Sequence, residues 1–203
     1  MENNKVAVVG TITEKYVYDH MVFGESFYRT AISLTRKSGK ADVIPVMISE
    51  RLIDVTEDMR GGRVALFGEY RSFNQCERER TKLILFIFCQ EIRPAEDYEQ
   101  EDENNVYLNG FICKKPTYRK TPLGREITDL LVAVNRPYGK TDYIPCVAWG
   151  MDARRTEGYE IGTRVQLYGR IESREYTKKI NEDECEQRTA YEISVNASAV
   201  VKE

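Results

Sequence analysis

Hydrophobic and polar residues alternate with a period of two along most of the chain, a pattern that predicts β-strands. Each half of the chain contains five such stretches. A short charged segment lies between the third and the fourth stretch of each half, at residues 50–59 and 151–159, and predicts a short helix that ends at a glycine. The predicted strands cover residues 5–14, 25–36, 41–48, 63–73 and 82–92 in the first half and 105–114, 126–136, 141–149, 164–176 and 188–200 in the second.

This order of elements predicts the fold class. Three strands, a helix and two further strands describe an OB-fold, a five-stranded Greek-key barrel that binds oligonucleotides or oligosaccharides. We therefore expect an all-β protein made of two tandem OB-folds, each with a short helix between its third and fourth strands.

The two halves are also similar in sequence. The run GKADVIP at residues 39–45 recurs as GKTDYIP at residues 139–145, with the same residue at five of the seven positions. Duplicated modules in a chain of 203 residues have the usual size of a small domain. We predict a first module at residues 1–93, a linker at 94–104 and a second module at 105–203. Further matches pair Gly10 with Gly110, Gly24 with Gly124 and Arg36 with Arg136.

The predicted linker carries most of the negative charge. The formal net charge is −3 at pH 7, which by itself does not favour a nucleic-acid ligand. Residues 94–104 contribute −6, whereas the first and second modules carry +1 and +2. The composition of the linker predicts an extended segment whose charges repel one another. The modules themselves are nearly neutral.

The chain offers no set of residues typical of an enzyme. Its five cysteines include no Cys-x-x-Cys pair, and its one histidine, His20, lies in a predicted loop. There is no glycine-rich phosphate loop and no nucleophile elbow, so we expect no catalytic residues, no metal and no cofactor. The odd number of cysteines argues against a disulfide framework, and no stretch of eighteen apolar residues suggests a membrane span. We expect a cytoplasmic, nucleoid-associated protein.

The second module contains a series of short motifs in a fixed order. They are VYLNG at 106–110, Pro116, TPLG at 121–124, LVAVNR at 131–136, TDYIPCVAWG at 141–150 and GTRVQLYGR at 162–170. These motifs extend through nearly all of residues 105–200, and together they resemble the bacterial single-stranded DNA-binding protein family. The resemblance implies sequence-tolerant binding of single-stranded DNA in replication, recombination or repair. The first module is similar only through its likeness to the second.

Alternation along the strands of the second module sorts its residues without reference to the family. In the third strand, Ile144, Cys146 and Ala148 are expected to point into the barrel, and Tyr143 and Trp149 are expected to point outward. In the fourth strand, arginines and tyrosines are expected on the outside. Such a surface suits a single strand, because bases stack on rings with about 1–3 kcal/mol each while Arg and Lys neutralise phosphates.

The outward residues and the resemblance together give the candidate site. We predict that Tyr143 and Trp149 stack on bases and that Tyr138 and Tyr176 assist, since the resemblance places stacking aromatic residues of the family at or near these positions. The alternative for Tyr176 is that it only covers the barrel. The residues expected to hold phosphates are Arg119, Lys120, Arg136, Lys140, Arg170 and Arg174.

The first module departs from this pattern. Val43 and Ser49 stand where the second module has Tyr143 and Trp149, so its third strand presents no ring. We therefore expect a depleted stacking face. The alternative is a role in assembly, with its strand face or the surfaces of Phe23, Phe27 and Tyr28 packed against a partner subunit. Weak contacts to DNA are expected from Arg36, Lys37, Lys40, Arg71 and Phe73.

The resemblance also bears on assembly and on partners. Family members with a single module work as assemblies of four barrels, so two modules per chain imply a homodimer. The sequence lacks the acidic tail of the family, so we do not expect replication or repair proteins to be recruited by that route. The acidic linker is expected to be solvated, although it could bind a partner or compete with DNA. The alternative functions are an OB-fold interaction adaptor, similar to a primosome component, with little DNA binding, and an RNA-binding OB protein.

Overall fold

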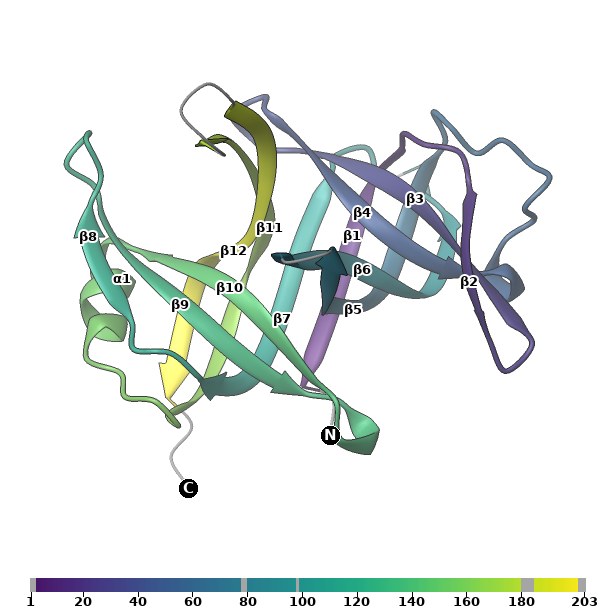
Figure 1. The fold of residues 1–203 in the computed structure, drawn as a ribbon. Coiled ribbons are helices and arrows are strands. Elements are labelled where there is room, and N and C mark those ends of the chain that lie inside the picture. Colours follow the sequence, from purple (N-terminus) through teal and green to yellow (C-terminus); the bar gives the residue numbers. More distant parts are fainter. Residues whose placement is uncertain (1–2, 78–79, 98, 180–184, 201–203) are drawn as a thin grey trace.

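Two β-barrels lie side by side and share one twelve-stranded sheet in the residues that the structure describes (Figure 1). The computed structural model describes residues 3–77, 80–97, 99–179 and 185–200. The strands of the first barrel are β1 (Asn4–Ile12), β2 (Val17–Val22), β3 (Glu25–Thr35), β4 (Ala41–Ser49), β5 (Arg63–Glu77) and β6 (Arg80–Pro94). Those of the second barrel are β7 (Glu103–Ile112), β8 (Thr117–Lys120), β9 (Glu126–Asn135), β10 (Thr141–Trp149), β11 (Arg164–Lys179) and β12 (Cys185–Val200).

The predicted class of two tandem OB-folds is confirmed. All ten predicted strands are present, and each barrel closes through one parallel pair, β4 with β6 and β10 with β12. The sequence analysis missed β2 and β8, which pair with β3 and β9 as hairpins. Both are short and largely exposed, so no buried face marked them in the sequence.

One pair of recurring glycines, Gly10 and Gly110, stands where strands of one barrel meet closely. A Cβ on Gly10 would lie 2.4 Å from the carbonyl oxygen of Ser33, and a Cβ on Gly110 would lie 2.4 Å from that of Ala133. Any side chain at either position would therefore force the first and second long strands of its barrel apart.

The helix predicted between the third and fourth long strands differs between the barrels. The second barrel has α1 (Gly150–Glu157), whereas the first has one 3-10 turn, η1 (Glu50–Leu52), followed by irregular chain. Asp54 accepts a hydrogen bond from the backbone of Thr56 at 2.9 Å, and Asp58 accepts one from the backbone of Arg60 at 3.2 Å. Such local bonds compete with a helix and explain the short turn. No helix in the described ranges is long and apolar enough to cross a membrane.

The two barrels are joined by antiparallel pairing of β1 with β7. Val6 lies opposite Val106, its own counterpart in the second module, while Asn4 lies opposite Leu108 and Val8 lies opposite Asn104. The pairing is therefore nearly symmetric about an axis between the modules, as in a contact between two identical subunits.

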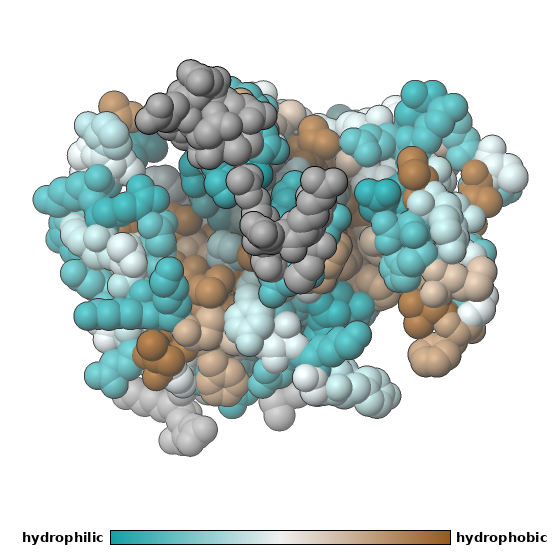
Figure 2. All heavy atoms as spheres, viewed as in Figure 1, coloured by the Kyte–Doolittle hydropathy of each residue, from teal (hydrophilic) through white to brown (hydrophobic). Residues whose placement is uncertain are grey.

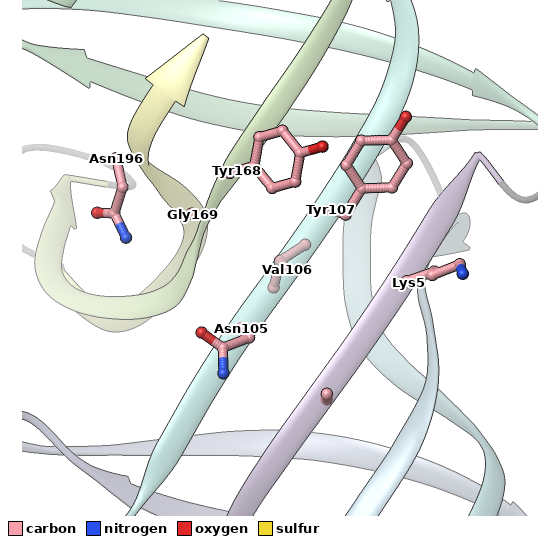
Figure 3. A pocket seen from close by; sticks show the side chains of 8 residues that line it. Lys5, Asn105, Val106, Tyr107, Tyr168, Gly169 and Asn196 are labelled. Carbon is pink, nitrogen blue, oxygen red and sulfur yellow. The ribbon is translucent and has the colours of Figure 1, made fainter.

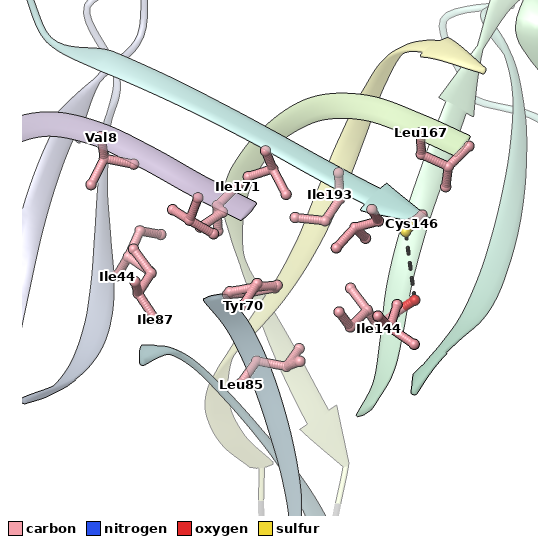
Figure 4. Close-up of a cluster of buried hydrophobic side chains, with 14 of the residues drawn as sticks. Val8, Ile44, Tyr70, Leu85, Ile87, Ile144, Cys146, Leu167, Ile171 and Ile193 are labelled. Atoms are coloured by element: carbon pink, nitrogen blue, oxygen red, sulfur yellow. Dashed lines mark hydrogen bonds between the residues drawn. The ribbon is translucent and has the colours of Figure 1, made fainter. Parts of the chain in front are cut away.

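The buried side chains of the two barrels form one continuous core. Figure 4 shows Tyr70 of β5 between Ile44 and Ile87 of the first barrel and Ile144 and Cys146 of the second. Tyr70 is completely buried. The barrels consequently share hydrophobic contacts in addition to strand hydrogen bonds.

Each barrel also reaches onto the other through its long terminal hairpin. Ser173 of β11 donates from its backbone N at 2.7 Å and from its hydroxyl at 2.8 Å to Asp42 of β4. Arg36 binds the same carboxylate through Nε at 2.6 Å and donates through Nη2 to the carbonyl of Ser173 at 3.1 Å. One buried aspartate thus holds an arginine of its own barrel and a strand of the other.

An equivalent contact joins the terminal hairpin of the first barrel to an aspartate of the second barrel. Ser72 of β5 donates from its backbone N to Asp142 of β10 at 2.5 Å, and Arg136 binds Asp142 through Nε at 2.6 Å. Arg136 also donates to the carbonyl of Ser72 at 2.9 Å. The recurrence of arginine and aspartate in the two modules is therefore explained by these two latches, which we call the Asp42 latch and the Asp142 latch.

The C-terminal part of the predicted linker is packed against the first barrel. Asp102 accepts hydrogen bonds from the backbone of Thr35 at 2.7 Å and from Arg63 at 2.6 Å. Glu99 accepts two bonds of 2.8 Å from Arg93, and the bond from this guanidinium holds the pKa of Glu99 at about 2. These carboxylates are paired, so this part of the segment differs from the solvated linker that the composition predicts.

The Asp42 latch predicts a large and pH-dependent contribution to stability. Burial alone would raise the pKa of Asp42, but hydrogen bonds from Arg36 and Ser173 outweigh it and hold the pKa below its usual value. Asp42→Asn removes the charge that Arg36 and Ser173 bind, with Glu172 left as the remaining carboxylate beside Arg36, and is expected to cost about 1.5–3 kcal/mol in urea unfolding at pH 7. The carboxylate contribution is complete above the unfolded pKa of about 4 and is lost as the pH falls through the folded pKa.

Asp129→Asn is the matched control, because Asp129 pairs with Arg119 at 2.7 Å on the surface and is expected to contribute less than about 1 kcal/mol. The loss of stability below about pH 4 should be steeper in the wild-type protein than in Asp42→Asn. Equal stabilities of the two variants at pH 7 would contradict the assigned role of the latch.

Candidate nucleic-acid interface

The strand β10 presents two aromatic rings on the outside of the second barrel, as alternation predicts. Ile144, Cys146 and Ala148 are buried, whereas Tyr143 is 43% exposed. Trp149 is partly buried, and its indole Nε1 donates to the hydroxyl oxygen of Ser194 on β12 at 3.1 Å. This bond fixes one edge of the indole on the barrel and leaves part of the ring accessible.

Trp149 lines a cleft of about 860 Å³ between the two barrels. The second barrel contributes Arg125 and Arg170 to the lining, and the β3–β4 turn of the first barrel contributes Arg36 and Lys37. Residues 101–105, where the predicted linker meets the second module, complete the lining. Predicted site residues of both modules therefore meet in one cleft, which we call the Trp149 cleft.

Most of the arginines predicted to hold phosphates are bound to carboxylates. Arg170 donates through Nε to Glu172 at 2.6 Å, and Arg36 lies 2.8 Å from the other oxygen of the same carboxylate. Arg119 is paired with Asp129, and Arg136 belongs to the Asp142 latch. A phosphate at any of these guanidinium groups would have to share it with a carboxylate.

The remaining predicted residues lie in two further places. Tyr138 is fully exposed at a left-handed position (φ 65°) in the β9–β10 turn. Arg174 lies on the β11–β12 hairpin with its Cζ 5.7 Å from the ring centre of Tyr176. Lys40 donates to the carbonyl of Ser173 at 3.1 Å. The exposed basic residues in the predicted set are Lys37, Lys40, Arg119, Lys120, Lys140 and Arg174, of which Lys40 binds the carbonyl of Ser173 and Arg119 binds Asp129.

The sequence analysis missed two carboxylates on this face. Glu172 and Glu192 lie opposite each other on β11 and β12, and burial raises the pKa of Glu192. The alternation that places Arg170 and Arg174 outward also places Glu172 outward, so this residue could have been found from the sequence.

The outer face of the first barrel is richer in rings than predicted. Val43 and Ser49 occupy β4 as expected, but Phe27 of β3 and Phe88 of β6 lie beside that strand with ring centres 5.8 Å apart. The third strand itself carries no outward ring, as predicted, but the prediction of a depleted face left these neighbouring rings out. It considered only the third strand, whereas the rings come from neighbouring strands whose pairing the sequence does not reveal.

Two more rings extend this surface along β5 and β6. Phe73 and Phe86 form an edge-to-face pair with centres 5.9 Å apart, and Arg71 places its Cζ 3.7 Å from the ring centre of Phe88. Phe73 is 46% exposed. We call the surface formed by Phe73, Phe86 and Phe88 with Arg71 the β5–β6 ring surface.

The residues considered for assembly lie elsewhere on the first barrel. Phe23 is fully exposed in the β2–β3 turn, near the exposed Met21 and Val22, and Figure 2 shows hydrophobic side chains where this hairpin projects. Tyr28 packs against the core and forms an edge-to-face pair with Tyr18. This hairpin is hydrophobic, but it carries no feature that identifies an occupant.

Comparisons with known proteins agree with this architecture. The model of the single-strand binding protein family matches residues 103–201. The single-stranded DNA-binding protein of Clostridium tetani is 36% identical over 83 residues, which cover 37% of this chain and 57% of that protein. Single-stranded DNA-binding protein B of Bacillus subtilis is 34% identical over 80 residues, which cover 36% of this chain and 71% of that protein.

A solved structure extends the likeness to both barrels. The crystal structure of a deletion mutant of the single-stranded DNA binding protein from Thermus aquaticus superimposes with a TM-score of 0.75. The match has 20% sequence identity and covers 98% of this chain and 95% of that chain. At this identity the likeness shows the tandem fold.

Two OB-folds with rings and basic groups outside their strands are typical of proteins that bind oligonucleotides. The chain belongs to the single-strand binding protein family. This is a family of binding proteins and not of enzymes, in agreement with the sequence. The match spans little more than half the length of the Clostridium tetani relative.

Proposed function

We propose that the chain binds single-stranded DNA with little dependence on base sequence, in support of replication, recombination or repair. The observation that carries the proposal is the Trp149 cleft, in which a partly exposed ring lies beside basic groups of both modules, while the carboxylates of Glu101, Asp102, Glu103 and Glu172 also line it. Bases stack on such rings whatever their identity, and basic side chains attract the backbone. The family membership of the chain and the names of its relatives support this ligand.

Stacking is the dominant contribution in this proposal. Tyr143 and Trp149 lie six positions apart on β10, which separates them by about 20 Å, so they would contact bases several nucleotides apart. Tyr138 and Tyr176 lie on the adjoining turn and hairpin and assist. The phosphate contacts come from exposed Lys37, Lys120, Lys140 and Arg174, with Arg119 and Arg170 sharing their carboxylate partners. Arg36 and Arg136 are engaged by the latches and are left out of the proposed phosphate set.

Removal of both rings of β10 should weaken binding. The variant Tyr143→Ala/Trp149→Ala loses two stacking platforms of about 1–3 kcal/mol each, so its Kd for labelled oligo-dT in fluorescence anisotropy should rise at least about tenfold. Tyr18→Ala removes an exposed tyrosine from β2 and should leave the Kd unchanged. An unchanged Kd for the double variant would refute the assignment, and no binding by the wild-type protein would favour the adaptor function.

The proposed phosphate contacts come mainly from four basic side chains of the described residues. We therefore predict that the affinity for single-stranded DNA depends only modestly on salt concentration. Four phosphate contacts on a single strand correspond to a slope of about −3 in a plot of log K against log salt concentration. The slope should be measured by anisotropy over several salt concentrations with oligo-dT. A slope more negative than about −6 would show that charge and not stacking dominates, contrary to the proposal.

We further propose that two chains assemble into a homodimer of four barrels through the outer face of the shared sheet. Tyr107 and Tyr168 lie on this face with ring centres 5.0 Å apart, beside a shallow hollow of about 200 Å³ that Lys5 and Asn105 also line (Figure 3). The backbones of β1 and β7 pair almost symmetrically, but Ala7 of β1 stands at the place of Tyr107 in β7, so both tyrosines belong to the second module. A second copy related by a twofold axis would contact this face with the same residues.

A charge in the centre of this face should prevent assembly. Light scattering is expected to give about twice the chain mass of 23.5 kDa for the wild-type protein and the single mass for Tyr168→Glu. Met151→Glu places a charge at an exposed position of α1 and should remain dimeric. A wild-type monomer at micromolar concentration would remove the proposed assembly.

A further inference from the structure

We propose that Glu172 occupies the place of a phosphate in the Trp149 cleft and competes with the nucleic-acid backbone for Arg170. The carboxylate thereby sets how tightly the cleft binds a single strand and how strongly this binding depends on salt. The inference rests on the proposed function, because it assigns an affinity-determining residue to the same cleft.

Two arginines from different modules converge on the carboxylate of Glu172. The Nε of Arg170 donates to one of its oxygens at 2.6 Å, and Nη1 of Arg36 lies 2.8 Å from the other. A phosphate would be bound by two guanidinium groups in the same way, because carboxylate and phosphate oxygens accept the same charge-assisted hydrogen bonds. All three side chains line the cleft together with Trp149. An anion site therefore lies beside the ring, and a carboxylate of the chain itself fills it.

The carboxylate is held in place, whereas one of its partners is accessible. Arg36 is bound through Nε and Nη2 to Asp42, which is completely buried, so its Nη1 holds Glu172 from a fixed position. The side chain of Glu172 is only 11% exposed, but that of Arg170 is 42% exposed. Arg170 also donates through Nη1 to Asn196 at 2.9 Å. A phosphate that enters from solvent can therefore reach Arg170, but it has to replace Glu172 there.

A comparison of the two modules shows that the fold does not require a carboxylate at this position. Counted from the register shift in the fourth long strand of each barrel, the same place holds Arg71 in β5 and Glu172 in β11. Arg71 donates through Nε to Glu69 at 2.8 Å, so the same kind of pair is present with its two charges exchanged. The Asp142 latch forms next to Arg71 all the same. Removal of the charge at position 172 is therefore compatible with folding.

The exchange of one anion for another at Arg170 gains little free energy. A phosphate that binds Arg170 leaves Glu172 with one partner fewer, in a cleft that Glu101 and Glu103 also line. The released carboxylate then repels the phosphate. Without this carboxylate, the guanidinium would be paired with small anions from solvent, which a phosphate sets free. Loss of the charge of Glu172 should therefore tighten binding and add one phosphate contact.

The first test removes the charge and keeps the shape of the side chain. Glu172→Gln should lower the Kd for labelled oligo-dT in fluorescence anisotropy at least about threefold. The slope of log K against log salt concentration should become more negative by about 0.7, the contribution of one phosphate contact on a single strand. Asp58→Asn is the matched control, because it removes a carboxylate that pairs with Arg60 at 2.8 Å outside the cleft, and it should change neither quantity.

A double-mutant cycle shows whether Glu172 acts through Arg170. In the Arg170→Ala background, Glu172→Gln should no longer tighten binding, because the guanidinium for which carboxylate and phosphate compete is absent. Equal tightening in both backgrounds would reveal a general effect of negative charge and would overturn the inference. An unchanged Kd and slope for Glu172→Gln would also overturn it and leave the proposed function intact. Failure of the wild-type protein to bind oligo-dT would instead refute the proposed function.

A further measurement uses the unaltered protein and so avoids any effect of the substitutions on folding. In an NMR spectrum of the arginine Nε–H groups, the signal of Arg170 is identified by its absence from the spectrum of Arg170→Lys. It should shift when oligo-dT saturates the wild-type protein, because a phosphate replaces the carboxylate at Nε. An Arg170 signal that stays in place at saturation would overturn the inference.

Discussion

The antiparallel pairing of β1 with β7 is the contact on which the rest of the molecule depends. It brings the two modules together about an internal axis, and this arrangement carries each terminal hairpin onto the other barrel. There the buried carboxylates of Asp42 and Asp142 bind one arginine of their own barrel and one strand of the other. The pairing of β1 with β7, the two latches and the shared core around Tyr70 then hold the outer faces of the two barrels in a fixed relation.

Pairing between arginines and carboxylates limits the number of basic groups that can contact phosphates. The modules are nearly neutral in composition, and many of their guanidinium groups are paired with carboxylates, either in the latches or in surface pairs such as Arg170 with Glu172. Few basic groups are left for phosphates, and rings supply the larger part of the proposed binding surface. A protein with an acidic net charge can bind a nucleic acid through ring stacking, provided that the bases of the nucleic acid are unpaired and able to stack.

The sequence predicted the strands, the duplication and the positions of Tyr143 and Trp149, because period-two alternation and local motifs carry that information. It did not predict which partners the arginines would find. Arg36 and Arg136 are close in sequence to Asp42 and Asp142, but the serines that complete the latches lie in the other module. Phe86 and Phe88 of the first barrel were also missed, because Phe88 joins β4 only through a parallel pairing of distant segments. Contacts between remote strands are set by the closed barrel and not by local pattern.

Titration of the intrinsic tryptophan fluorescence with oligo-dT tests the central claim most directly, since Trp149 is the only tryptophan and lies in the cleft between the barrels. The account predicts saturable quenching by the single strand and little change with duplex DNA of the same length. Emission that stays constant at oligo-dT concentrations where anisotropy shows full binding would place the strand away from Trp149 and contradict the account.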